Sequence, residues 1–304
     1  MQRTSFLMLT VTCLLALGQV HAQPAATDHD QKVAHAITPT WENDRDLLVM
    51  LNEAADRVVF ARLIVETSLH EPGLSGRQRY DGLRVAGSSL FHDRQFLEAA
   101  AALAQAAHHT QDVREKAEVG AASAEALTLA GPGHAAAALA AFQAAVDAYL
   151  SCDLSTLRAA AVESACRRLV HVAMEQDAHT TALTYAGQAV TLAEQGALDI
   201  ADVGYFRYSA AFAADKNVDH AQAVLLYDKF LDAHAGYMNS QPVLGLMVHA
   251  LVRRELANGS SWRSPDEALI TKIMEILRDP AYTRMPARVN YAEKLAAAWD
   301  KQHA

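Results

Sequence analysis

The chain has 304 residues, of which 51% are hydrophobic and 20% charged, and its formal net charge is -9. An acidic chain without a basic stripe lacks the Lys and Arg contacts that give affinity for phosphates, so we expect no nucleic-acid binding and no docking on an anionic membrane surface. The apolar share is mostly Ala and Leu, with few β-branched or aromatic residues, and this composition favours helices.

The N-terminus has the pattern of a secretory signal. Arg3 precedes an apolar run over residues 6–17, and a small-x-small site ends at Ala22. We therefore predict a signal peptide over 1–22, cleaved after Ala22, and a mature chain that is periplasmic or secreted without stable membrane insertion. An uncleaved anchor and a lipoprotein attached at Cys13 are the alternatives, although the residues before Cys13 make a poor lipobox.

Two cysteines, Cys152 and Cys166, remain in the mature chain. An oxidising compartment favours a disulfide between them. However, placement at the end of one helix and well inside the next would separate their Cα atoms by roughly 10–15 Å. The alternative is a pair of buried thiols, and the sequence leaves both open.

Residues 23–39 are polar and read as a flexible leader, and residues 40–76 form an N-terminal helical segment. Apolar residues recur at helical spacing from Trp41 to about His70, with Thr40 as a plausible N-cap. This stretch is either one long helix or two helices with a bend. Pro72 and Gly73 end it.

Small residues then recur at fixed steps, in or close to a small-x3-large-x2-small face, in the second helix of each of four helix pairs. Such a face lets a helix approach its neighbour closely. The faces are Ala99-x3-Leu103-x2-Ala106, Ala138-x3-Phe142-x2-Ala145, Ala182-x3-Ala186-x2-Ala189 and Ala223-x3-Tyr227-x2-Phe230. The pairs span 79–107, 115–148, 157–196 and 201–231, with turns at 93–96, 131–133, 176–179 and 215–219.

This rhythm resembles the tetratricopeptide repeat, in which antiparallel helix pairs stack into a solenoid. Equivalent alanines (99, 138, 182, 223) are 39, 44 and 41 residues apart, compared with about 34 in the family. The signature Trp and closing Pro are absent, and only the first pair has the first-helix Gly, Gly87. A divergent repeat and another α-solenoid of similar pairs both fit. We predict an all-α fold, an α-solenoid over 77–236 with C-terminal capping helices over 237–304.

The sequence contains no nucleophile elbow, phosphate loop, dinucleotide-binding glycine motif, Cys-x-x-Cys or zinc-protease motif. We therefore expect no cofactor and no metal. His171 and Glu175 are four residues apart and share a helix face, but no third ligand accompanies them. An enzyme or small-ligand site using Arg167, His171 and Glu175 is the alternative function.

The resemblance implies that the first helix of each pair binds a protein or peptide partner in a concave groove. Placing Gly87, Val170 and Ala211 at equivalent positions selects ten candidate residues. They are Asp81, Arg84, Ser88, His92, Arg167, His171, Glu175, Tyr205, Tyr208 and Phe212. The leading hypothesis is an adaptor or scaffold whose partner is a protein or peptide, and self-association through the end helices is a third hypothesis.

Overall fold

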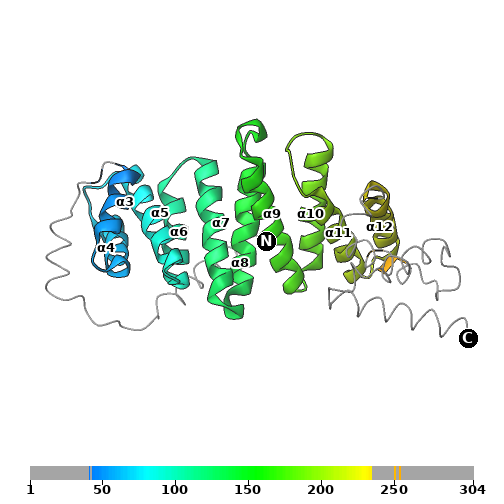
Figure 1. Ribbon diagram of the computed structural model, residues 1–304, viewed down its shortest axis with the longest axis horizontal. Helices are drawn as coiled ribbons and strands as arrows, with labels where there is room; N and C mark the ends of the chain where they lie inside the picture. Colours follow the sequence, from blue (N-terminus) through cyan, green and yellow to red (C-terminus); the bar gives the residue numbers. More distant parts are fainter. Residues whose placement is uncertain (1–40, 42, 235–249, 251–252, 255–304) are drawn as a thin grey trace, which may run out of the picture. The chain divides into compact units, whose positions relative to one another are not determined.

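The structure is a computed structural model that describes residues 41, 43–234, 250 and 253–254. Across these residues the regular elements are all helices, and no strand occurs among them (Figure 1). The predicted signal peptide and leader lie outside this part of the chain, as do all but three residues of the predicted capping helices. No helix within the described ranges is long and apolar enough to cross a membrane.

The chain divides into two compact units, with the boundary between Cys152 and Asp153. This boundary falls inside the predicted repeat region over 77–236. The helices of unit 1 are α3 (Asp44–Glu53), α4 (Arg57–His70), α5 (Gly76–His92), α6 (Phe96–Ala106), α7 (Val113–Ala130) and α8 (Ala135–Leu150). Those of unit 2 are α9 (Ala159–Glu175), α10 (His179–Glu194), α11 (Val203–Lys216) and α12 (His220–His234).

Within each unit, helices that follow one another along the chain pack side by side as antiparallel pairs. The segment before Pro72 is two helices, α3 and α4, so it forms a pair of its own. The side chain of Asn43 caps α3 and that of Asp56 caps α4, each accepting two backbone N–H bonds of the first turn. Thr40, the expected cap, lies outside the described residues.

The small-x3-large-x2-small faces account for the packing of the second helices. These faces lie on α6, α8, α10 and α12, and none of their twelve residues is more than 3% exposed. The close approach is clearest at Gly87 on α5, where an added Cβ would lie 2.8 Å from Cγ of the buried Leu103 on α6. The sequence prediction of tightly paired helices is confirmed.

Three of the four predicted turns have the same backbone conformation at one residue. Arg94, Asp177 and Val218 adopt φ values of 60°, 53° and 62°, in the left-handed region that L-residues rarely occupy. In each turn the next residue donates its N–H to a carbonyl five residues back, as Gln95 does to Leu90 at 2.8 Å. This arrangement is the Schellman end of a helix, formed here without glycine.

Both remaining cysteines are free thiols, Cys166 buried and Cys152 half-buried. Burial, with a smaller contribution from the charge of Glu163, raises the pKa of the Cys166 thiol to about 12. Cys166 lies on the buried face of α9, in the environment of a small apolar residue.

Candidate functional site

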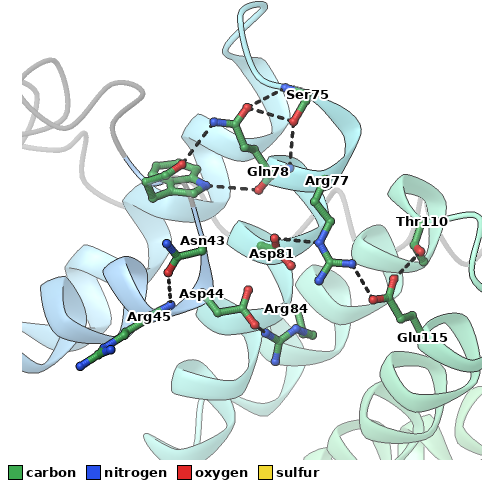
Figure 2. Close-up of polar contacts among 11 residues, drawn as sticks. Asn43, Asp44, Arg45, Ser75, Arg77, Gln78, Asp81, Arg84, Thr110 and Glu115 are labelled. Carbon is green, nitrogen blue, oxygen red and sulfur yellow. Dashed lines mark hydrogen bonds and ion pairs between the residues drawn. The ribbon is translucent and has the colours of Figure 1, made fainter.

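The first helix of each pair is the candidate binding element: α3, α5 and α7 in unit 1, and α9 and α11 in unit 2. In unit 1 these helices are joined by arginine–carboxylate pairs (Figure 2). Arg77 of α5 donates from Nε to Asp81 at 2.9 Å and from Nη1 to Glu115 of α7 at 2.6 Å. Thr110 Oγ1 donates to the other oxygen of Glu115 at 2.5 Å.

Arg84, one turn along α5 from Asp81, bonds Oδ2 of Asp44 at the start of α3. Arg77 and Arg84 also lie against the ring of Tyr80, with guanidinium carbons 5.0 and 5.9 Å from its centroid. Tyr80 is buried, and the face of its ring makes a cation–π contact with each guanidinium. The predicted candidate Arg84 therefore contacts a neighbouring helix of its own unit.

Asp81 is only 4% exposed, and one of its oxygens, Oδ1, is buried without a hydrogen-bond partner. Burial raises the pKa of this carboxyl to about 6, the neighbouring Asp44 adds to the shift, and Arg77 opposes it. The structure thus places Asp81 inside unit 1, where it bridges helices. The other two candidates on α5, Ser88 and His92, are exposed, and the Ser88 hydroxyl bonds the Arg84 carbonyl at 2.9 Å.

In unit 2, Arg167 of α9 connects α9 to α11. Its Nη2 lies 3.2 Å from Glu163 and 3.0 Å from Asp202, which caps α11. Glu163 in turn accepts the backbone N–H groups of 201 and 202 at 2.9 and 3.2 Å. The Arg167 guanidinium also stacks over Tyr205, 4.6 Å from the ring centroid.

Tyr205, Tyr208 and Phe212 of α11 lie at steps of three and four residues, so they share one helix face. We call these three residues the aromatic row. All three are half-buried, and the rings of Tyr208 and Phe212 stack at a centroid separation of 6.0 Å. Cations lie at both ends of the row: Arg167 over Tyr205, and Lys216 with its Nζ 5.4 Å from the Phe212 ring.

His171 and Glu175 lie on the same side of α9, one and two turns beyond Arg167. Their side chains are both 57% exposed, and His171 Nε2 is 3.3 Å from Glu175 Oε1. This is the geometry of a surface pair on one helix. Over the described ranges no group of three metal-ligating side chains could hold an ion. The three residues of the alternative site thus share a helix, but Arg167 turns toward α11.

Sequence reasoning overlooked several participants, namely Asp44, Arg77 and Glu115 in unit 1 and Glu163 and Asp202 in unit 2. A signal for them exists, because the paired residues are one repeat apart in the chain. Asp44 and Arg84 are separated by 40 residues, and Arg77 and Glu115 by 38. The same spacing recurs in unit 2, where Arg167 and Asp202 are 35 apart. An arginine and an acid at repeat spacing on first helices indicate a bridge between neighbouring repeats.

No family model matches this sequence, and no curated protein matches it. Solved structures of helical-repeat proteins do. A single-substitution form of a Podosopora anserina kinesin light chain with nearly identical TPR-like repeats is 18% identical, covering 66% of this chain and 95% of that one, with a TM-score of 0.47. A second structure of that protein is 16% identical (76% and 98% covered, TM-score 0.45). BtubC from P. vanneervenii is 13% identical (80% and 91% covered, TM-score 0.42). In this chain the described helices of each unit form consecutive antiparallel pairs with small residues at their contacts, which is an all-α helical-repeat arrangement.

Proposed function

We propose that this protein is a periplasmic or secreted adaptor that binds a protein or peptide partner through the face of its first helices. A helical repeat presents an extended surface made of equivalent positions on successive helices, and such a surface suits an extended chain. The absence of recognisable catalytic motifs in the sequence agrees with a binding role. The predicted signal peptide over 1–22 supports the location.

The aromatic row carries this proposal. Three rings on one face of α11 remain half-buried, while Phe206, Ala210 and Ala213 on the same helix are buried. Half-buried Tyr and Phe side chains supply large contact area at a low cost in conformational entropy, and they are typical of binding hot spots. The flanking Arg167 and Lys216 supply donors for the carbonyls or carboxylates of a bound peptide.

The test is affinity capture with the chain from Gln23 onward, using a periplasmic extract and identifying what remains bound. Tyr208→Ala and Phe212→Ala should each lose a stoichiometric partner. Leu225→Ala on α12 is the matched control, because it removes an apolar side chain that is 55% exposed but lies outside the aromatic row. Thermal unfolding of each variant shows whether the fold survives. A partner retained by both folded aromatic variants would refute the role of this face.

The proposed location has a separate test. Full-length chain expressed in a bacterium should appear in the periplasmic fraction with Gln23 as its first residue. Recovery of a chain that begins at Met1 in the cytoplasm would contradict the location without affecting the binding proposal.

A further inference from the structure

Two carboxyl groups from different helices of unit 1 each have an oxygen with no bonding partner. Asp44 Oδ2 is bonded by Arg84, and Asp81 Oδ2 by Arg77. The other oxygens, Oδ1 of Asp44 and Oδ1 of Asp81, are both buried without a hydrogen bond. Figure 2 shows the two side chains between Arg77 and Arg84, where α3 packs against α5.

Two ionised carboxylates cannot satisfy each other, because each offers only acceptors and both carry negative charge. A buried acceptor left unpaired is costly, and a like charge close by adds to the cost. One proton removes both penalties, since the protonated carboxyl donates an O–H to the other. We propose that Asp44 and Asp81 share one proton, and that this proton makes the contact between α3 and α5 a latch that weakens as the pH rises.

The surrounding charges do not replace the proton. Arg77 and Arg84 on α5 already bond the Oδ2 oxygens of Asp81 and Asp44. Arg77 is also bonded to Glu115 of α7. The two cations therefore face three carboxylates.

Among the residues that the structure describes, the remaining neighbours of α5 contribute no further cation to the pair. From α4, Ser68 lies against Gly82, and from α6, Leu103 lies against Gly87. His109, in the 3-10 helix η1 (Ala107–His109), is near Arg79; its pKa is lowered first by burial and then by that cation. None of these groups offers Asp44 or Asp81 a counter-charge.

The titration of Asp81 agrees with this arrangement. Its pKa of about 6 lies above the ordinary 3.8, first because of burial and then because of the neighbouring Asp44 carboxyl. That difference is roughly a hundredfold in proton affinity. Because the folded pKa is raised, the stabilisation is fully present below about pH 4 and is lost as the pH rises through about 6. The sharing of this proton does not depend on whether the first helices bind a peptide.

The experiment is a pH titration of the chain from Gln23 onward, labelled with 13C at aspartate carboxyls and followed by NMR. One aspartate should titrate near pH 6, and its signal should vanish in Asp81→Asn. In Asp44→Asn the Asp81 midpoint should fall toward its ordinary value, because an amide replaces the second carboxyl. Asp93→Asn is the matched control: Arg57 bonds both Asp93 oxygens, at 2.6 and 2.8 Å, and lowers its pKa.

Stability gives a second measurement. The urea midpoint of the wild type should fall relative to that of Asp81→Asn as the pH is raised from about 5 to about 7.5. Relative to Asp93→Asn, the urea midpoint of the wild type should not fall over the same pH range. The proposal is overturned if every aspartate titrates below about pH 5, or if the high titration persists unchanged in either Asp44→Asn or Asp81→Asn.

Discussion

Replacing Val218 by glycine should stabilise unit 2. Val218 sits at φ 62° in the turn between α11 and α12, two residues before α12 begins. The left-handed conformation places Cβ too close to the following carbonyl oxygen, and a β-branched side chain tolerates it least. The side chain is 71% exposed, so its removal sacrifices little packing.

The size of the effect follows from two opposing terms. Relief of the left-handed strain contributes about 1–2 kcal/mol. Glycine lowers the free energy of unfolding by about 0.5–1 kcal/mol, because it has more conformational freedom to lose on folding. We therefore expect a net gain of up to about 1.5 kcal/mol for Val218→Gly. Val218→Ala keeps a Cβ in the same conformation and should gain much less.

The equivalent turns provide an internal comparison. Asp177 has φ 53° at the same position of the turn between α9 and α10. Aspartate visits the left-handed region more readily than valine, so Asp177→Gly should change the free energy of unfolding by less than Val218→Gly does. Urea unfolding monitored by circular dichroism measures both. A loss of stability in Val218→Gly, or a larger gain in Asp177→Gly, would refute the reasoning from backbone strain.

Two other expectations concern a helix contact and the thiols. Gly87→Ala should destabilise unit 1 by about 1–3 kcal/mol, because its Cβ would meet Leu103 at 2.8 Å. Gly187→Ala, in α10 with nothing within 4 Å of its Cβ, should instead stabilise by about 0.5–1 kcal/mol; the same sign for both in urea unfolding would contradict the close-contact argument. In the native chain from Gln23 onward, a thiol reagent should modify Cys152 and spare Cys166, whose pKa burial raises to about 12. In urea the reagent should modify both. Two unreactive thiols after unfolding would indicate a disulfide.

The fold was largely predictable because close helix packing leaves a mark in the sequence. Alanines at fixed steps, as at Ala138 and Ala145, mark the buried face of a second helix whatever their neighbours are. The turn at 131–133 was visible through its glycines and proline; Gly131 there has φ 117°. The break between α3 and α4 was less visible, because Ala54 and Ala55 continue the helical pattern and only the cap at Asp56 marks the new helix.

The candidate site was less predictable, because periodicity selects a helix face without saying what covers it. Asp81 and Arg84 lie on the expected helix, but their bonding partners are Arg77 and Asp44, respectively. Both partners lie outside the pattern of small residues. The pKa of Asp81 depends on its own burial and on the carboxyl of Asp44, 37 residues earlier in the chain (44 to 81), and no local sequence pattern shows either.

Burial separates the polar candidates into two kinds. Arg167 and Asp202 form a bridge whose side chains are 39% and 51% exposed. Exposed ion pairs contribute about 0–1 kcal/mol, so a partner's carboxylate can replace Asp202 at small cost. Asp81 is 4% exposed, and withdrawing its buried carboxyl from Arg77 would leave a charge without a counter-ion, at a cost of several kcal/mol. Changing Arg167 should therefore alter partner capture more than stability, whereas changing Asp81 should alter stability and its pH dependence and leave capture by unit 2 unchanged.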